Sequence, residues 1–546
     1  MSSFSIAGQL VDLHQRRIYP AEIIVQQGRI RAIQELREAP ARYLLPGFID
    51  AHVHIESSML APAAFAQMAV VHGTIASVSD PHEIANVCGE EGVQWMIRNA
   101  SITAFKAYFG APSCVPATDF ETAGATLDAE AIDRLMQSPD IWYLSEMMNY
   151  PGVLQGAPEI VAKIEAAKRQ GKPVDGHAPG LRGAEAARYA AAGISTDHEC
   201  TSLEEALDKI AAGMHILIRE GSAAKNFEAL HLLLAQHPDR VMLCSDDKHP
   251  DDLAVGHINS IVQRALDKGH ELFDVLRAAC VNPALHYRLP VGLLRAGDPA
   301  DFQVLHDLEN WHPSQVYING VVVADEGMCK FEITKPDPIN RFNAQPRNRE
   351  DFGVTAVTAH PEVRVIQAHD GQLTTTSFIA RLSSMDGWIQ TDIAQDVLKL
   401  AVINRYEPQA LPALAFIKGF GFKRGAIAST VAHDCHNIIA VGADDAEICA
   451  AVNAVIAAKG GVSVAMTGDE VYCLPLPIAG LMSADDGQRV ASQYAALSTA
   501  AKSLGSDLAA PFMTLSFMAL LVIPALKLSD RGLFDGTEFR FTDVVL

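Results

Sequence analysis

The chain has 546 residues and a formal net charge of −22, with 43 Lys and Arg against 65 Asp and Glu. Hydrophobic residues make up 49% and charged residues 20% of it, which excludes a disordered chain and predicts buried cores in about three or four domains. The acidic balance argues against a protein that grips a phosphate backbone, because such binding needs basic charge, but it allows a small neutral base as a ligand.

The first predicted unit is a small β-sandwich domain made from two flanks of the chain. Residues 4–34 show short apolar runs separated by polar turns, as small antiparallel strands do, and residues 301–324 have the same texture. We therefore predict that residues 1–45 and 286–345 form one β domain that brackets the segment between them.

The segment between the flanks, residues 46–285, is predicted to be a (β/α)8 barrel of the TIM type. Eight apolar strand candidates end in polar residues, and helical stretches such as APEIVAKIEAAKRQ separate them. The strand candidates are IDAHVH, IASVSD, FKAYFG, WYLSE, PVDGH, ISTDH, MHILI and VMLCSD. The predicted fold class is therefore α/β.

From about residue 346 the pattern changes, and residues 346–546 are predicted to form an additional C-terminal α+β domain. Its apolar stretch, residues 511–526, is too short for a comfortable membrane span and contains two prolines, so we predict a buried core segment. Nine cysteines without a C-x-x-C pair, and a start without a secretory pattern, favour a reducing compartment. We expect a cytoplasmic homodimer or higher homo-oligomer with no membrane or nucleic-acid partner.

The strongest local signal is PGFIDAHVHIESS at residues 46–58. Successive side chains of a strand point to opposite faces, so His52 and His54 share one face. Two imidazoles at the end of a strand can bind one metal ion. An isolated H-x-H is a weak signal, but its place on the first barrel strand strengthens it.

Later strand ends supply further donors. Glu146 closes the fourth predicted strand, His177 the fifth, His198 the sixth and Asp246 the eighth. In such barrels functional residues gather at the carboxyl ends of the strands, so six donors from five strands could converge on one point. Any one of them could be an ordinary solvated residue, whereas all six at matching positions favour a site.

The charges of these donors favour two divalent ions over one. Glu146, Asp246 and a bridging hydroxide carry three negative charges against four positive ones, while neutral imidazoles carry none. A single ion would leave one carboxylate idle, whereas a carboxylate between two ions is a natural bridge, and paired metals lower the pKa of a shared water. Nitrogen and oxygen donors without thiolate suit Mn²⁺ or Fe²⁺, which we expect, with Zn²⁺ as an alternative.

Further motifs accompany these donors over residues 46–289 and in the C-terminal domain. They are PGFIDAHVHIESSM, SDPHEIANVCG, LSEMMNYPGV, DGHAPGL, STDHECTS, LCSDDKHPDDL, VNPALHYRL, AHDCHNI, AMTGDEVYCLPLPIAGLMS and PFMTLSFMALLVIPALKLSDRGLFD. Through them, nearly the whole chain resembles the adenine deaminase family of the amidohydrolase superfamily. The resemblance implies that His52 and His54 bind the more buried metal, that Glu146 bridges, and that His177 and His198 bind the second metal.

The same resemblance makes Asp246 the residue that touches a metal and accepts the proton of the water. Where the family usually has Cys-Thr-Asp-Asp, this chain has Cys-Ser-Asp-Asp at residues 244–247, which keeps both carboxylates. Many members of the superfamily use a carbamylated lysine as the bridge, and this chain offers Glu146. Asp247 and His249 either contact the purine or hold Asp246 in place.

The implied reaction is the hydrolytic deamination of adenine to hypoxanthine and ammonia, an activity of purine salvage. A metal-activated hydroxide attacks C6, Asp246 takes the proton, N1 gains a proton, and the amino group is protonated before it leaves. The second-strand cluster of carboxylates and an imidazole suits acid–base work, and Asp80 is the favoured shuttle because it sits at the strand end. His82 and Glu83 either join it or shape the following turn.

The C-terminal domain adds one polar cluster whose role stays open. His433, Asp434 and His436 either bind an extra metal, or reach over the barrel mouth toward the substrate, or form a polar turn that satisfies its own backbone. The role of Gly468 and Asp469 stays open between a functional and a structural one in the same way.

Two other functions remain compatible with these residues. One is another amidohydrolase, which opens a cyclic amide such as a hydantoin or dihydropyrimidine or acts on a different aminopurine. The other is a catalytically silent scaffold on the same fold. A scaffold would be expected to have lost a metal ligand, and none of the six is lost.

Overall fold

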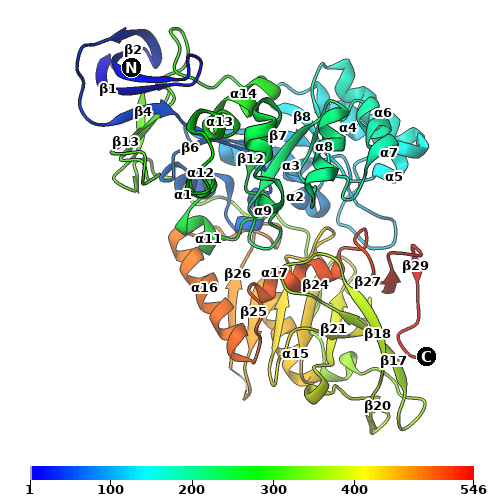
Figure 1. Ribbon diagram of the computed structural model, residues 1–546. Helices are drawn as coiled ribbons and strands as arrows, with labels where there is room; N and C mark the ends of the chain where they lie inside the picture. The colour runs from blue at the N-terminus through cyan, green and yellow to red at the C-terminus, as the bar shows by residue number, and fades with distance from the viewer. Residues whose placement is uncertain (1–2, 469) are drawn as a thin grey trace.

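The barrel contacts the small β domain on one side and the C-terminal domain on another (Figure 1). The structure is a computed structural model that describes residues 3–468 and 470–546, so Asp469 lies outside the described residues. In those described parts of the chain, no helix combines the length and the apolar content needed to cross a bilayer.

Eight parallel strands form the barrel at the predicted positions. They are β5 (Phe48–Val53), β6 (Thr74–Ser79), β7 (Lys106–Ala111), β8 (Ile141–Met147), β9 (Val174–Gly176), β10 (Thr196–Asp197), β11 (His215–Arg219) and β12 (Val241–Cys244). β5 to β9 pair in chain order, and so do β10 to β12. Backbone hydrogen bonds from Ser195 to Val174 and from Asp246 to His52, both 2.9 Å, close the ring. The predicted barrel is confirmed.

Helices fill the connections between the strands and cover the outside of the barrel (Figure 1). α4 illustrates the pattern: Ile132, Leu135 and Met136 are buried at helical spacing, and Asp128 caps the first turn. The barrel helices are α1 (Pro62–Val70), α2 (His82–Cys88), α3 (Glu90–Ala100), α4 (Ala129–Gln137), α5 (Tyr150–Gln155), α6 (Pro158–Arg169), α7 (Gly183–Ala191), α8 (Leu203–Ala211), α9 (Phe227–Leu230), α10 (Leu233–Gln236), α11 (Pro250–Val255), α12 (Ile258–Asp267), α13 (Leu272–Leu276) and α14 (Asn282–His286).

Both flanks of the barrel join in one β domain. Its strands are β1 (Phe4–Asp12), β2 (Arg17–Gln26), β3 (Arg29–Glu35), β4 (Tyr43–Pro46), β13 (Phe302–Leu305), β14 (Gln315–Ile318), β15 (Val321–Asp325) and β16 (Met328–Cys329). They form a single sheet in the order β16-β15-β14-β13-β4-β1-β2-β3. The sheet curls over its own core. Phe4 of β1 stacks on Tyr317 of β14, three strands away, with ring centroids 5.5 Å apart, which a flat sheet would not allow.

The C-terminal domain is built on an eight-stranded sheet with the order β18-β17-β22-β21-β24-β23-β25-β26. All its neighbouring strands run antiparallel except the parallel pair β17 and β22. The strands are β17 (Glu362–Gln367), β18 (Thr376–Arg381), β21 (Leu398–Ile403), β22 (Ala413–Lys418), β23 (Ala426–Ser429), β24 (Ile438–Gly442), β25 (Gly461–Ala465) and β26 (Val471–Pro475).

Smaller elements complete this domain. They are the hairpin β19 (Ser384–Met385) and β20 (Trp388–Ile389), the strands β27 (Leu526–Ser529), β28 (Gly532–Asp535) and β29 (Arg540–Phe541), and the helices α15 (Asp445–Ala457), α16 (Gly487–Ser503) and α17 (Pro511–Ser516). Residues 511–526 lie in the core, with Phe512 2% and Leu515 0% exposed, which confirms the prediction of a buried segment.

Each face of the C-terminal sheet packs against a different partner. Side chains of a strand alternate between faces, so Leu400 and Val402 of β21 join the large core that also includes barrel residues. Ala401 and Ile403 of the same strand join a second core with α15. The sheet therefore lies between α15 and the barrel side of the molecule (Figure 1).

The C-terminal domain also contacts the loop that follows β7. Thr122 Oγ1 donates to Asp530 Oδ2 at 2.7 Å, and Asn437 Nδ2 donates to the carbonyl of Thr122 at 2.9 Å. The ring of Phe120 lies 4.8 Å from that of Phe534. These contacts hold the turn around residues 430–437 above the carboxyl ends of the barrel strands.

Candidate metal centre and active site

The structure brings all six predicted donors together at the carboxyl ends of the strands. His52 lies in β5 with His54 just after it, and Glu146 lies near the end of β8. The other three lie within two residues of the end of a strand: His177 after β9, His198 after β10 and Asp246 after β12. Subsets of these donors, with ligand atoms within 4.8 Å of one another, form groups that could hold a metal ion.

Glu146 lies between two groups of histidines. Its Oε1 is 3.4 Å from His54 Nε2. Its Oε2 is 2.7 Å from His177 Nδ1 and 3.1 Å from His198 Nε2. The two oxygens of one carboxylate thus face opposite halves of the site, which is the arrangement that a bridging ligand requires.

Asp246 faces the first histidine pair. Its Oδ1 lies 3.3 Å from His54 Nε2 and 3.7 Å from His52 Nε2, and the two ring nitrogens are 3.2 Å apart. Two imidazole nitrogens directed at each other and at a carboxylate make a nitrogen–oxygen donor set that suits a divalent cation.

The two carboxylates are held in the ionised form. Burial alone would raise the pKa of Glu146, but the imidazoles of His177 and His198 outweigh it and hold that pKa well below its usual value. In the same way, the guanidinium of Arg219 outweighs burial and holds the pKa of Asp246 well below its usual value. Both groups are therefore available as anionic ligands at neutral pH.

Asp246 is fixed from two sides. Arg219 donates to its Oδ2 at 2.6 Å and also pairs with Glu199, and the backbone of Asp246 adopts a positive φ of 53°. The neighbouring residue Ser245 is bound through its backbone and hydroxyl by Asp50, whose carboxylate accepts from His257 at 2.8 Å. Asp246 thus has little freedom to turn away from the histidines.

The cluster on the second strand adjoins this centre. Asp80 directly follows β6, and its Oδ2 lies 3.2 Å from His82 Nδ1. The same His82 nitrogen is 3.4 Å from Glu146 Oε1, and His82 Nε2 is 3.3 Å from Glu83 Oε1. The imidazole of His82 therefore connects the predicted bridge to Glu83.

The C-terminal turn reaches over the barrel mouth and holds Glu83. His433 Nδ1 is 2.5 Å from Glu83 Oε1, and His436 contacts the other oxygen. Burial would raise the pKa of Glu83, but His433, His82 and His436 outweigh it and hold that pKa well below its usual value. Of the alternatives predicted for this cluster, a turn that only satisfies its own backbone does not match these contacts.

Asp434, in the same turn, has a different environment. Burial raises its pKa to about 6. Among the described residues, Asp434 Oδ2 and His433 Nε2 are buried without a hydrogen-bond partner, and both residues line the cavity at the barrel mouth. Unpaired buried polar atoms beside a cavity indicate a polar ligand or an ordered water there.

The two residues predicted to contact substrate or hold Asp246 diverge. Asp247 lines the cavity and accepts a hydrogen bond from Ser57 Oγ at 2.5 Å. His249 turns toward the C-terminal domain instead, with its Nδ1 2.6 Å from the hydroxyl of Tyr494, and it is not among the lining residues. The geometry thus favours a positioning role for His249.

Sequence reasoning missed several residues of the cavity. Glu199 lies 3.5 Å from His198 and 3.6 Å from His177, and Arg219 clamps Glu199 and Asp246. A signal for Arg219 existed, because it ends β11, the seventh strand. Four C-terminal side chains, which we call the apolar wall, complete the lining: Leu373, Phe517, Leu520 and Ile523.

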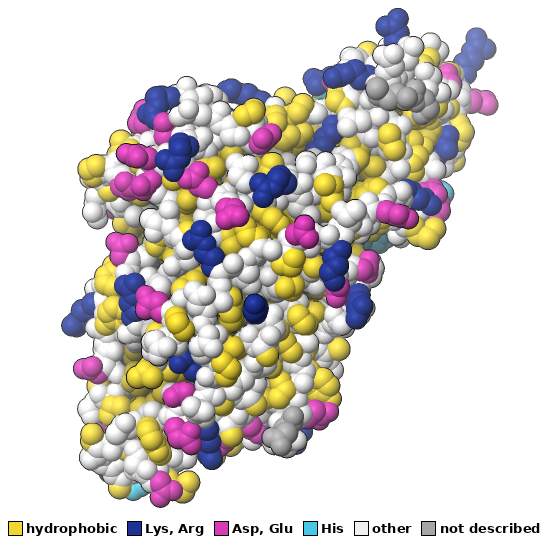
Figure 2. Space-filling view, turned by 180° about the vertical axis from the view of Figure 1, so that it is seen from behind, with side chains coloured by type: hydrophobic (Ala, Val, Ile, Leu, Met, Phe, Trp, Pro, Cys, Tyr) yellow, Lys and Arg dark blue, Asp and Glu magenta, His cyan; other side chains and the backbone are white. Residues whose placement is uncertain are grey.

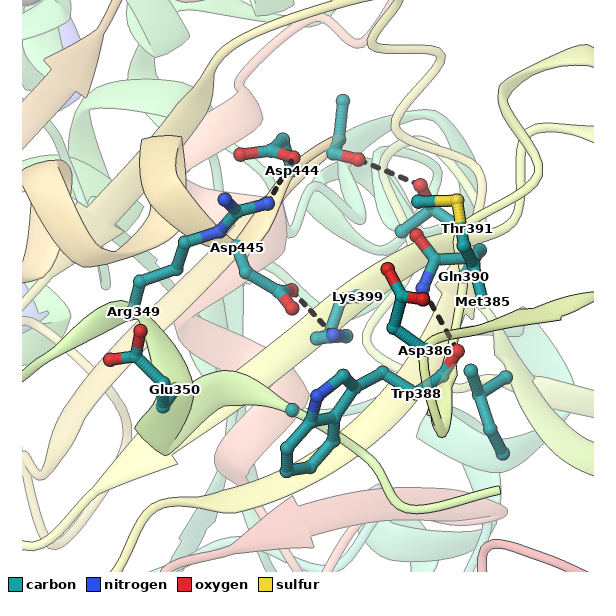
Figure 3. Close-up of a pocket in the computed structure, with 13 residues that line it drawn as sticks. Arg349, Glu350, Met385, Asp386, Trp388, Gln390, Thr391, Lys399, Asp444 and Asp445 are labelled. Carbon is teal, nitrogen blue, oxygen red and sulfur yellow. Dashed lines mark hydrogen bonds and ion pairs between the residues drawn. The ribbon is translucent and has the colours of Figure 1, made fainter. Parts of the chain in front are cut away.

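Another cavity, of about 280 Å³, lies wholly within the C-terminal domain (Figure 3). Both of its basic groups have acidic partners: Lys399 contacts Asp445, and Arg349 lies 3.7 Å from Asp444. It shares no lining residue with the barrel cavity. On the face shown in Figure 2, Lys and Arg are interspersed with Asp and Glu and do not gather in one basic strip.

Comparison with known proteins identifies the class that this barrel and donor set define. Residues 43–323 match the amidohydrolase family, and residues 372–540 match the adenine deaminase C-terminal domain. The donor cluster and this match together indicate a site for divalent metal.

Relatives that match nearly the whole chain identify the family within this class. Proteins named adenine deaminase from Salinibacter ruber, Sulfurovum sp. and Methanosarcina barkeri are 56%, 54% and 49% identical to this chain. The matches cover 99%, 98% and 98% of this chain and the same shares of the relatives. The chain belongs to the adenine deaminase family.

Proposed function

We propose that this protein hydrolyses adenine to hypoxanthine and ammonia at the barrel mouth. The observation that carries the proposal is the position of Glu146 between His54 on one side and His177 and His198 on the other. Relatives named adenine deaminase at 47–56% identity over nearly the full length support adenine as the substrate. A role in purine salvage is consistent with that activity.

The residues fit a pair of divalent ions, which we propose to be Mn²⁺ or Fe²⁺, with Zn²⁺ as the alternative. Two ionised carboxylates and four imidazoles without a thiolate form a donor set of that kind. When bound, such a pair lowers the pKa of a shared water so that hydroxide is available at neutral pH. The proposed ligands are His52, His54, Glu146, His177, His198 and Asp246.

The residues of the chain move the protons. Water adds its oxygen to C6 of adenine and loses one proton to Asp246, which Arg219 holds in place. N1 gains a proton as C6 becomes tetrahedral. The new C6 hydroxyl then gives up the second proton of the water, the amino group gains a proton, and the C6–N bond breaks, so that ammonia leaves and C6 keeps the oxygen as a carbonyl. Asp80, His82 and Glu83 lie in one connected chain beside Glu146 and are the proposed acid–base shuttle.

Polar groups around the cavity are proposed to orient the base. Asp247 lines the cavity together with His433 and Asp434, which have unpaired atoms among the described residues, so the cavity offers both donors and acceptors. His249 is proposed to hold Asp246 in place and not to contact the base, because its ring bonds the hydroxyl of Tyr494 and does not line the cavity.

The domain boundaries are proposed to be those predicted: a β domain of residues 1–45 and 286–345, a barrel of 46–285 and a C-terminal domain of 346–546. The uninterrupted pairing of β4 with both β1 and β13 supports the first of these units. We further propose a cytoplasmic homodimer or higher homo-oligomer, whose mass light scattering would measure.

The test is a deamination assay of protein loaded with Mn²⁺, Fe²⁺ or Zn²⁺, against adenine, guanine, cytosine and adenosine. We expect ammonia release and the ultraviolet change of hypoxanthine formation with adenine, loss of activity after chelation, and recovery when metal returns. Opening of a hydantoin or dihydropyrimidine with adenine inert would instead assign the site to a cyclic-amide hydrolase. Two bound metal equivalents would count against a silent scaffold, which need not hold them.

A further inference from the structure

Two adjacent residues that follow β21, Arg405 and Tyr406, take no part in the proton transfers described above. Arg405 is fully buried, Tyr406 is half-buried, and neither lines the cavity at the barrel mouth. Both are nevertheless bonded to the C-terminal turn, residues 433–437, which holds Glu83. Any effect of these two residues on the reaction must therefore pass through that turn.

Arg405 and Tyr406 bind three consecutive residues of the C-terminal turn. The hydroxyl of Tyr406 donates to the carbonyl of Cys435 at 2.6 Å, and Arg405 Nη1 donates to the carbonyl of His436 at 3.2 Å. The backbone N–H of Arg405 donates to Asn437 Oδ1 at 3.1 Å. With three successive residues held, the turn has little freedom to move away from the barrel.

His436 has a backbone conformation that needs such support. Its φ is 54°, in the left-handed region that residues with a side chain seldom adopt. Its Nδ1 accepts a hydrogen bond from the backbone N–H of Ala432 at 3.2 Å, so Nε2 carries the proton and donates to Glu83. The direction of this ring, and with it the contact to Glu83, therefore depends on the backbone of the turn.

The guanidinium of Arg405 is anchored on its other side by the linker of residues 330–348, which leads from the β domain to the C-terminal domain. Arg405 Nη2 donates to Asn340 Oδ1 at 2.6 Å, and the carbonyl of Arg405 accepts from the backbone N–H of Asn343 at 2.8 Å. The Arg405 Cζ also lies 4.9 Å from the ring centroid of Phe342. The guanidinium thus joins the linker to the turn.

Ion pairing does not account for this buried charge. Among the described residues no carboxylate pairs with Arg405, its Nε has no hydrogen-bond partner, and burial lowers the pKa of the guanidinium. A buried charge without an opposite charge nearby lowers the stability of a fold. The side-chain hydrogen bonds that Arg405 makes are to the turn and to the linker, so its position is explained by what it holds.

We propose that Arg405 and Tyr406 are positioning residues, which hold the C-terminal turn so that the imidazole of His436 stays bonded to Glu83. The inference rests on the proposed function, in which Glu83 belongs to the acid–base shuttle. Because neither residue lines the cavity, their loss should slow turnover without displacing the base or the metal ions. The expected effect is therefore on kcat and not on KM.

The first measurement uses two single variants of the full-length, metal-loaded protein. Tyr406→Phe removes only the hydroxyl bonded to Cys435 and should lower kcat for adenine by about threefold to tenfold, the size of one lost hydrogen bond. Arg405→Lys keeps the charge, but one ammonium lacks the planar fork that reaches both His436 and Asn340, so kcat should fall by about tenfold. KM should stay within about twofold of the wild-type value, and both metal equivalents should remain bound.

The His436→Gln background separates positioning from a merely structural role. If Arg405 and Tyr406 act through His436, then Arg405→Lys and Tyr406→Phe should cause almost no further loss of kcat once His436 is replaced, because residues in one network are not additive. Losses that multiply in the double variants would overturn the proposal, and so would wild-type kcat in both single variants. Should Arg405→Lys fail to fold, the cycle with Tyr406→Phe alone decides.

Tyr317→Phe is the matched control. Tyr317 lies in the β domain, is 8% exposed, and donates its hydroxyl to Gln315 Oε1 at 3.0 Å. This variant loses the same kind of hydrogen bond away from the C-terminal turn, so kcat should stay at the wild-type value.

Hydrogen exchange followed by mass spectrometry separates this proposal from the proposed function, because it reports the local opening of the backbone without any reaction. Peptides that cover residues 430–437 should exchange faster in Tyr406→Phe and Arg405→Lys than in the wild-type protein, and no faster in Tyr317→Phe. If the wild-type protein releases no ammonia from adenine, the proposed function fails, and the exchange rates still decide whether the two residues hold the turn. Unchanged exchange in both variants would overturn the inference.

Discussion

The barrel and the C-terminal domain contribute opposite chemistry to one cavity. The barrel supplies ionisable donors from the ends of its parallel strands, with Glu146 and Asp246 among the imidazoles. The C-terminal domain supplies the apolar wall and a turn whose His433 and His436 hold Glu83. The two regions thus contribute different kinds of side chain to the same cavity, and each can be changed separately.

Two buried lysines, one in each region, have different partners. Lys209 of the barrel lies 3.1 Å from Asp197 and 2.8 Å from Glu205, so its charge is neutralised. Lys527 of the C-terminal domain donates to two backbone carbonyls, and burial lowers its pKa to about 7. Of these two lysines, Lys209 is therefore neutralised by carboxylates, whereas Lys527 is held only by backbone carbonyls.

The largest expected effect comes from Asp246→Asn on the barrel side. The amide keeps the shape and one oxygen donor but cannot take the proton of water, so kcat should fall by about 10²–10⁴-fold. Metal content, measured by atomic emission, should remain near that of the wild-type protein. If kcat stays within a few-fold of the wild-type value, Asp246 is not the base.

Glu146→Gln should act mainly on metal binding. Removing the negative charge between His54 and the His177–His198 pair should weaken the second equivalent of metal, with activity that rises again at high metal concentration. Titration of the apoprotein with Mn²⁺, followed by activity and bound metal, measures this. If the variant still binds two metal ions tightly and turns over normally, Glu146 is not the bridging ligand. Glu165→Gln, on the exposed face of α6 (Pro158–Arg169), is the control.

Most of the barrel side could be predicted from the sequence, for a physical reason. The carboxyl ends of parallel barrel strands lie on one side, so polar residues that end such strands must come close together. His177, His198 and Asp246 follow this rule, and so does Arg219 at the end of the seventh strand, although it was overlooked. His249 departs from it because it lies five residues past β12, at the start of α11 (Pro250–Val255), where its ring meets Tyr494.

The C-terminal side could not be predicted in this way. Glu83 and His436 are 353 positions apart, and no periodic pattern in the chain reports a contact between two domains. The apolar stretch 511–526 could be recognised as buried, because its length and prolines exclude a membrane span. Which surface it covers depends on the docking of Phe120 and Thr122 against the C-terminal domain, and that is a property of the assembled fold.

A smaller loss of activity is expected when Glu83 loses its hydrogen-bond partner from the C-terminal domain. His436→Gln should lower kcat by about 10–100-fold while both metals stay bound, because partners that orient functional groups have effects of this size. The acidic limb of the kcat profile should shift as well, since His436 is one of the groups that hold the pKa of Glu83 low. His286→Gln, at a histidine that contacts Ser195 away from the cavity, is the control. An unchanged profile would reduce His436 to a structural role.

The smallest effect concerns stability, in the comparison of the two lysines. In the folded protein the pKa of Lys527 is about 7 against an ordinary 10.5, so between these values the unfolded chain binds more protons than the folded one. The free energy of unfolding of the wild-type protein should therefore rise with pH relative to Lys527→Met, by at most about 1.4 kcal/mol per pH unit. Below pH 7 both states are protonated and the difference between the two proteins should level off.

Lys209→Met is the control and should show no such rise over this window, because the carboxylates beside Lys209 raise its pKa. Urea unfolding of both pairs between pH 6 and pH 9 measures the effect. Parallel curves for wild type and Lys527→Met would mean that Lys527 stays charged in the folded domain.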